Sequence, residues 1–67
     1  MYKIKEIGSI TFEYGSYQEK ADRIGIALSS LSRILKGKQT TKYATAYCIV
    51  KLFNPEKEVL DYFEKID

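Results

Sequence analysis

Between residues 16 and 37, apolar positions follow the 3.6-residue period of an α-helix in two successive runs. In the first run the apolar side chains are Tyr17, Ala21 and Ile24. Gly25 follows directly, and glycine supplies the left-handed backbone at which helices commonly end. The pattern therefore predicts a helix over 16–24, with a second helix beginning about one turn later.

The second run, over 28–36, separates apolar from polar residues most clearly. Leu31, Ile34 and Leu35 form an apolar stripe on one side of the predicted helix. The opposite side combines small hydroxyl groups with two cations and has no carboxylate, whereas a merely solvated face usually mixes both charges. We therefore expect this side to be the working surface of the protein. Its residues are Ser29, Ser32, Arg33 and Lys36.

Residues 41–53 predict a third helix, for which Thr40 or Thr41 would be the N-cap. Cys48 falls on its apolar stripe and is expected to be a small buried hydrophobe rather than a reactive thiol. The predicted stripe consists of Ala44, Tyr47, Cys48 and Leu52, widened by Ile49.

A fourth helix is predicted over 55–66. Asn54 can cap it, Pro55 suits its first position, and acidic residues favour the positive end of the helix dipole. Five acidic residues against two lysines give residues 55–67 a charge of −3, which is a poor surface for a polyanion. Its apolar stripe, which we expect to close the core, consists of Val59, Leu60, Phe63 and Ile66, with Tyr62 beside it.

Residues 1–15 fit two patterns. Ile4, Ile7, Ile10 and Tyr14 recur at helical spacing, but the stretch is rich in residues that favour strands, and Gly8-Ser9 could form a hairpin turn. We expect a short extended segment followed by a helix over 10–14, with Ser9 as its N-cap.

Charge is unevenly distributed along the chain. No Asp or Glu occurs between Asp22 and Glu56, an interval that contains six Lys or Arg residues and therefore carries +6. Because the whole chain carries only +2, the remainder carries −4. A concentration of positive charge of this kind indicates an anionic partner for the middle of the chain.

Composition excludes several classes of protein. Sixty-seven residues are expected to form one domain, 1–67, and no apolar run approaches the roughly 20 residues of a membrane span or resembles a secretory signal. Cys48 is the only cysteine and histidine is absent, so neither an internal disulfide nor a zinc site is expected. No catalytic constellation is visible, and we expect no enzyme activity, no cofactor and no metal.

A family resemblance rests on Ala21, Gly25 and Ile26, followed by Leu31-Ser32-Arg33-Ile34-Leu35-Lys36-Gly37. With these residues, 16–53 resembles the helix-turn-helix of the XRE family, the DNA-binding domains of the phage Cro and lambda-repressor type. The resemblance implies an all-α fold of four to five helices, with the helix-turn-helix at about 16–37. It also implies a sequence-specific regulator of transcription that binds double-stranded DNA in the cytoplasm of a bacterial or phage-infected cell.

The resemblance places the 28–36 helix in the major groove of DNA. Ala27 stands where the family usually has a capping Ser or Thr, and Tyr17 where it usually has Gln. Leu28 fits either a thymine methyl or the core, and Tyr43 fits either a phosphate or internal packing. The expected base-reading residues are Leu28, Ser29, Ser32 and Arg33, and the expected phosphate contacts are Tyr17, Gln18, Lys36, Lys38, Thr40, Lys42 and Tyr43.

Two further expectations concern protein partners. A homodimer would match the two-fold symmetry of operators, although the last helix could equally close a monomer. Because Arg33 is the only arginine among the expected readers, a protein-binding helix-turn-helix module, such as an antirepressor or nuclease inhibitor, is the alternative function. The expected dimer contacts are Val59, Tyr62, Phe63 and Ile66.

Overall fold

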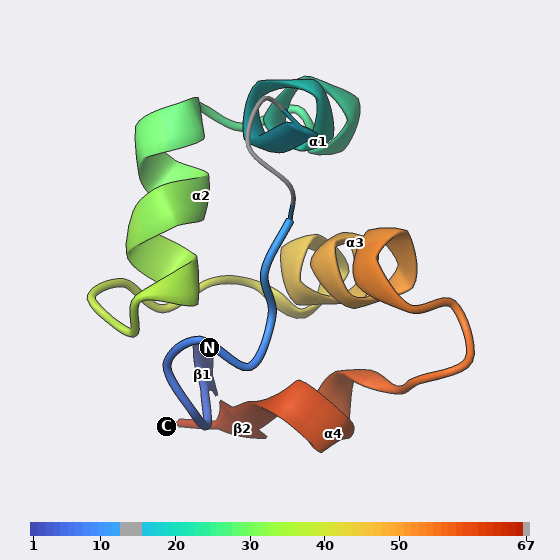
Figure 1. Ribbon diagram of the computed structural model, residues 1–67. Coiled ribbons are helices and arrows are strands. Elements are labelled where there is room, and N and C mark those ends of the chain that lie inside the picture. The colour runs from blue at the N-terminus through green and yellow to red at the C-terminus, as the bar shows by residue number, and fades with distance from the viewer. Residues whose placement is uncertain (13–15, 67) are drawn as a thin grey trace.

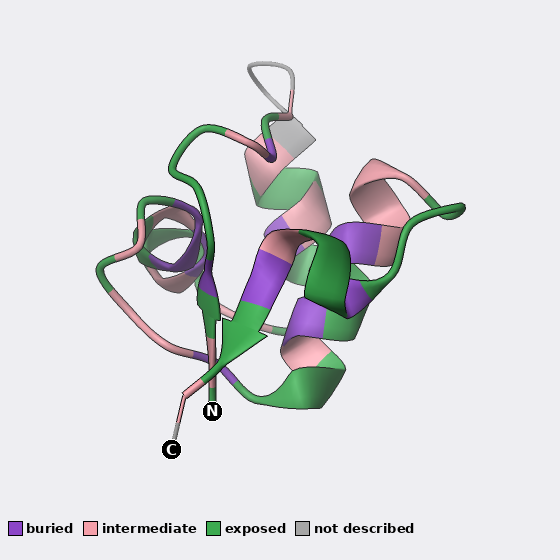
Figure 2. Ribbon diagram, turned by 90° about the horizontal axis from the view of Figure 1, so that it is seen from below, coloured by how far each residue is buried: buried purple, intermediate pink, exposed green. Residues whose placement is uncertain are grey.

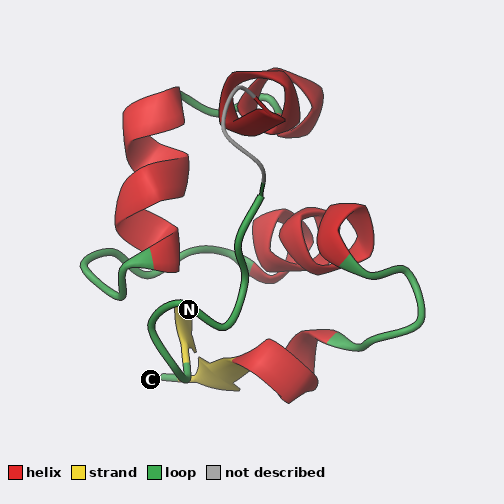
Figure 3. Cartoon of the chain, in the orientation of Figure 1, coloured by secondary structure: helices red, strands yellow, loops and turns green. Residues whose placement is uncertain are grey.

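In the computed structural model, which describes residues 1–12 and 16–66, three longer helices stand above a pair of strands formed by the chain ends (Figure 1). Figure 3 shows this strand pair in yellow below the three longer helices. None of the helices among the described residues has the length and apolar character needed to cross a membrane. The elements are β1 (Tyr2–Ile4), α1 (Ser16–Ile24), α2 (Leu28–Leu35), α3 (Tyr43–Phe53), α4 (Val59–Tyr62) and β2 (Phe63–Lys65).

The corner between α1 and α2 forms as the sequence predicts. Gly25 has a φ of +89°, and its amide donates to the carbonyl of Ala21 at 2.8 Å. The Ile26 amide donates to the same carbonyl at 3.1 Å, which closes the end of α1. Ala27 then adopts the extended N-cap conformation of α2 but makes no side-chain capping bond, as expected for alanine.

The end of α2 is closed by a Schellman motif. Gly37 has a φ of +74°, its amide donates to the carbonyl of Ile34 at 3.2 Å, and the Lys38 amide donates to that of Arg33 at 2.9 Å. The predicted helices over 16–24 and 28–36 are therefore confirmed to within one residue.

One core joins all the elements, because every helix and both strands contribute a buried residue (Figure 2). From α2, the residues that enter the core are the three of the predicted apolar stripe. The prediction of which side of α2 is buried is therefore confirmed. The buried apolar residues are Ile4, Ile10, Ala21, Leu31, Ile34, Leu35, Ala46, Ile49, Val50, Val59 and Phe63.

The side of α3 that meets the core differs from the prediction. Nearly all residues of α3 are apolar, so two of its sides satisfy the helical period. The small alanine and two β-branched residues pack inward, and the tyrosines keep their hydroxyl groups in water. The expectation that Cys48 is buried is therefore wrong. Of the predicted stripe only Ile49 is buried; Ala44, Tyr47 and Cys48 are exposed and Leu52 is half-buried. The other buried residues of α3 are Ala46 and Val50.

Neither Thr40 nor Thr41 is the N-cap of α3. The N-cap is Lys42, in extended conformation. Thr41 instead forms an antiparallel bridge with Tyr2, in which the Tyr2 amide donates to Thr41 at 2.7 Å and the Thr41 amide donates back at 2.8 Å. Thr41 is only 7% exposed. The start of α3 is thus fixed by contact with the N-terminal strand rather than by a capping hydroxyl.

The chain ends form an antiparallel sheet, so the expectation of an all-α fold is wrong. Tyr2 pairs with Lys65 and Ile4 with Phe63. The described part of the fold is predominantly helical with a two-stranded sheet. The short extended N-terminal segment is confirmed as β1. Its partner lies some 60 residues away, too far for a local pattern to indicate.

The predicted helix over 55–66 is reduced to the four residues of α4. The side chain of Asn54 accepts a bond from the Glu56 amide at 3.1 Å, which makes a turn rather than a helix start. The helix begins after Glu58, whose amide donates to the carboxylate of Asp61 at 2.8 Å. Residues 63–65 are extended because their backbone groups pair with those of β1. In a longer helix the same groups would find their partners within the helix.

The sequence predicts a helix over 10–14, but residues 10–12 are not helical. Residues 13–14 lie outside the described chain. Ser9 does not cap a helix, because its amide and hydroxyl both donate back to the carbonyl of Glu6, at 3.2 and 2.7 Å. The Phe12 amide donates to the hydroxyl of Tyr17 at 3.0 Å. A turn at Ser9 and a side-chain hydrogen bond at Phe12 therefore satisfy backbone amides of this segment, in place of helical hydrogen bonds.

Candidate nucleic-acid interface

The polar side of α2 faces solvent. Ser29, Arg33 and Lys36 are exposed and Ser32 is partly exposed, on the side opposite the buried stripe. Leu28 is 39% exposed, which places it on the surface rather than in the core. The four residues expected to read bases therefore lie on one accessible side of one helix.

Arg33 is oriented by a residue that the sequence analysis did not single out. Its Nε donates to the side-chain oxygen of Gln39 at 3.0 Å, across the turn at Gly37. A guanidinium has five N–H donors, and the bond at Nε uses only one of them. Because Gln39 restricts this long side chain, less conformational entropy would be lost when Arg33 binds a partner.

The cations that surround α2 have no acidic partner among the residues that the structure describes. Within residues 1–12 and 16–66, the only ion pair joins Lys51 to Glu58, at 3.7 Å. Lys36, Lys38 and Lys42 are all exposed, and no carboxylate of the described chain lies within ion-pair distance of them. Their charge is thus directed to the solvent side of α2 and of the loop that follows it.

The remaining residues expected to contact phosphate are held in different ways. Thr40 is half-buried in the loop. Tyr43 is about half exposed and packs edge-on against Tyr2, with ring centres 5.5 Å apart, so it combines internal packing with an accessible surface. Gln18 is exposed and donates to the carboxylate of Asp22 at 2.9 Å, which directs its amide along α1.

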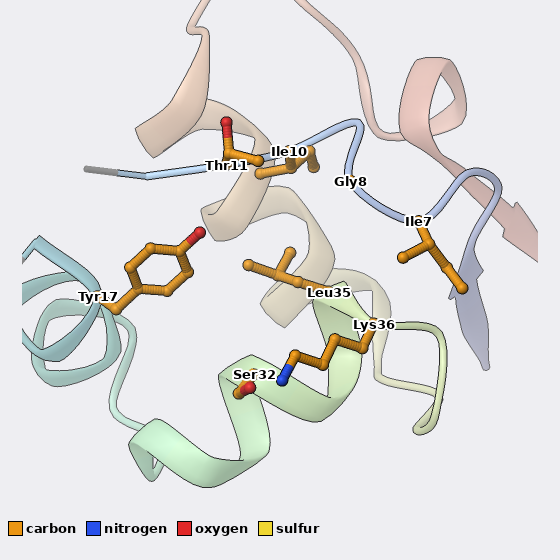
Figure 4. Close-up of a pocket in the computed structure, with 8 residues that line it drawn as sticks. All are labelled: Ile7, Gly8, Ile10, Thr11, Tyr17, Ser32, Leu35 and Lys36. Atoms are coloured by element: carbon orange, nitrogen blue, oxygen red, sulfur yellow. The ribbon is translucent and has the colours of Figure 1, made fainter. Parts of the chain in front are cut away.

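Tyr17 borders a groove that also includes part of α2 (Figure 4). Its ring packs edge-on against Phe12, with centres 5.4 Å apart, and its hydroxyl accepts the Phe12 amide. The groove has a volume of about 260 Å³ and is lined by the 7–11 loop together with Tyr17, Ser32, Leu35 and Lys36. Three residues expected to contact DNA are therefore brought together on its walls.

The residues expected to form a dimer do not share an exposed surface. Val59 and Phe63 are buried in the core of the chain itself, and Tyr62 packs edge-on against Phe53. Ile66 is half-buried, and its amide donates to the carbonyl of Met1 at 2.8 Å. Leu60, which the sequence places on the same stripe, is 59% exposed.

The described residues include no group of three or more His, Cys, Asp or Glu side chains arranged to hold a metal ion. Comparison of the chain with models of protein families, with curated proteins and with solved structures finds no match.

Proposed function

We propose that this chain is a sequence-specific regulator of transcription that binds double-stranded DNA and is similar to the XRE family in its helix-turn-helix. The observation that carries the proposal is the exposed polar side of α2, which has two cations and no carboxylate. The major groove of DNA admits an α-helix, and small side chains such as serine allow its backbone to approach the base edges. Its place of action would be DNA in a bacterial or phage-infected cell.

The proposed contacts divide into base reading and phosphate binding. Arg33, held by Gln39, is suited to bidentate bonds with guanine, and Leu28 is suited to a thymine methyl. Lysines of the following loop would bind phosphates and fix the register of the complex without reading sequence. Occupancy of the operator by the bound protein would block polymerase or a competing regulator.

The test begins with selection of bound sequences from a random duplex pool, followed by titration of selected and random DNA at several salt concentrations. Arg33→Ala should weaken specific binding by about 1–3 kcal/mol and relax the sequence preference. Lys38→Ala should weaken binding to all sequences alike and lower the salt slope by about one. Equal losses from both variants on selected and random DNA would contradict the division of roles.

Gln39→Ala provides a matched test of how Arg33 is oriented. It should weaken binding to the selected sequence but not to random DNA. In the Arg33→Ala background it should have little further effect, because residues that act as a unit are not additive. An additive loss would show that Gln39 acts independently of Arg33.

A homodimer is part of the proposal. It predicts a palindrome among the selected sequences, with half-sites about one helical turn apart. Since Val59 and Phe63 are occupied within the chain, the dimer contacts would come from the more accessible residues near them, including Leu60 and Ile66. A single unrepeated half-site would favour a monomer.

A protein partner is the second candidate function. Leu28 on α2 and Tyr43 and Tyr47 on α3 are large side chains that are each between 39 and 49% exposed, which suits a protein surface as well as DNA. The two functions are separated by a salt-dependent binding assay on random duplex DNA. Absence of binding at low salt and micromolar protein would favour the protein partner.

A further inference from the structure

The groove between the 7–11 loop and α2 is lined mainly by apolar atoms (Figure 4). Leu35 and Ile10 are buried beneath it, and the ring of Tyr17 forms one end. Ile7 stands at the other end and is 70% exposed. An occupant of the groove would remove this apolar surface from water.

One wall of the groove is polar and basic. Ser32 and Lys36 lie one turn apart on α2, and in Figure 4 the Lys36 side chain extends along the helix toward Ser32. No carboxylate of the described residues pairs with Lys36. The hydroxyl of Tyr17, by contrast, is already bonded to the Phe12 amide. The groove therefore has an apolar end and a separate cationic wall suited to an anion.

We infer that this groove binds a small amphipathic acid, in which a branched or aromatic hydrocarbon body carries a single carboxylate. The body would pack on Ile7 and on the ring of Tyr17, above the buried Ile10 and Leu35, and the carboxylate would meet Lys36 and the hydroxyl of Ser32. An inorganic anion would leave Ile7 exposed, whereas a neutral hydrocarbon would leave the ammonium group of Lys36 without a partner.

The size of the groove restricts the ligand further. Its 260 Å³ lies just below the roughly 300–1,000 Å³ typical of drug-sized ligands. About ten non-hydrogen atoms are the expected size, and for so small a ligand we expect a dissociation constant on the order of a millimolar.

The acid would also compete with DNA. Tyr17, Ser32 and Lys36 line the groove and are proposed DNA contacts, so one surface cannot serve both partners at once. The acid would then act as an effector that releases DNA. This consequence rests on the proposed function, whereas binding of the acid does not.

The test uses 3-phenylpropionate as the probe and 3-phenyl-1-propanol as its neutral counterpart, each titrated into the full chain labelled with ¹⁵N. The acid should shift amide resonances of the 7–11 loop and of Ser32 and Lys36, and should bind about tenfold more tightly than the alcohol. Lys36→Gln should abolish this tenfold preference. Lys38→Gln, which has an equal change of charge at an exposed position outside the groove, should preserve it.

A second pair of variants tests the apolar end. Ile7→Ser should weaken acid and alcohol alike, by about fivefold or more. Leu60→Ser, at a leucine that is 59% exposed and lies away from the groove, should change neither. Both sites are exposed, and the spectra themselves report whether each variant is folded. Shifts that are largest outside the groove, or a Lys36→Gln variant that keeps the preference for the acid, would overturn the inference.

The two proposals fail separately. Displacement of bound duplex DNA by the acid, at concentrations near its dissociation constant, is expected if both hold. If the chain does not bind DNA, the shifts and the Lys36→Gln comparison still decide whether the groove binds the acid. If DNA is bound but the acid produces no localised shifts, the inference fails while the proposed function stands.

Discussion

The α1–α2 unit and the two chain ends are stabilised in different ways. Within residues 16–38, the bonds that end each helix join residues at most five positions apart, at Gly25 and at Gly37. The ends depend on each other across the whole chain, since Ile4 pairs with Phe63. Yet both parts meet in one core. Hydrogen bonds between near neighbours in the sequence therefore define the ends of α2, while the core on which α2 packs includes residues from both ends of the chain.

The largest effect should come from breaking that support. Phe63 is completely buried, and Phe63→Ala should cost about 3–5 kcal/mol in the free energy of unfolding, because it removes apolar contacts and leaves a cavity. That loss approaches the whole stability expected of so small a domain. Urea denaturation followed by circular dichroism would measure it. Leu60→Ala, at an exposed neighbour, should cost well under 1 kcal/mol.

If Phe63→Ala loses all its helical signal in a single transition, the α1–α2 unit and the chain ends unfold together. If Phe63→Ala retains most of its helical signal, with only a small change in midpoint, the α1–α2 unit remains folded without the terminal sheet.

An intermediate effect is expected at the corner of the α1–α2 unit. Gly25 has a φ of +89°, and a Cβ there would meet nothing within 4 Å, so Gly25→Ala tests backbone strain without a steric clash. The expected loss is about 1–2 kcal/mol by the same denaturation experiment. Gly25→Asn should lose less, because asparagine tolerates the left-handed conformation. Equal stability of the alanine variant and the parent would contradict the local description of this corner.

The smallest effect should be a gain. Ala27 has the extended N-cap conformation of α2 but no side-chain acceptor, so Ala27→Ser should stabilise the fold by about 1 kcal/mol. A rise in the melting temperature of a few degrees would report the gain. Ala27→Val, which keeps the site apolar, should not reproduce it. A serine variant no more stable than the parent would mean that the N-terminal amides of α2 already have adequate partners.

These differences explain how far the fold could be predicted from the sequence. The ends of α1 and α2 follow from Gly25 and Gly37, and the buried side of α2 follows from the contrast between its apolar and polar residues. In α3 this contrast is missing. The apolar pattern predicts that Cys48 is buried, whereas in the structure Cys48 is exposed and Val50 is buried. Periodicity indicates a helix there but not its orientation.

The chain ends could not be predicted by the same reasoning. The apolar residues near Phe63 satisfy helical spacing, and only pairing with β1 makes this segment extended. Likewise Thr41 resembles a cap in the sequence, but its bridge to Tyr2 decides its role. Contacts between residues some 40 to 60 positions apart leave no periodic signal in a single sequence.

The candidate site was predicted in part. The exposure of Ser29, Arg33 and Lys36 follows from the stripe opposite them. The bond between Arg33 and Gln39 depends on how the Gly37 turn directs the loop, and the groove depends on the non-helical path of residues 7–11. Both features arise from tertiary arrangement rather than from residue type.

The pairing of β1 with β2 has one more consequence. The amino group of Met1 donates to the carbonyl of Ile66 at 3.3 Å, and the Ile66 amide donates back at 2.8 Å, so the chain comes close to forming a ring. A short glycine-serine linker across this gap, with new termini opened between Glu56 and Lys57, would give a circular permutant whose strands form a local hairpin. Its contact order would be lower, and we expect it to fold faster than the parent chain while presenting the same α2 surface.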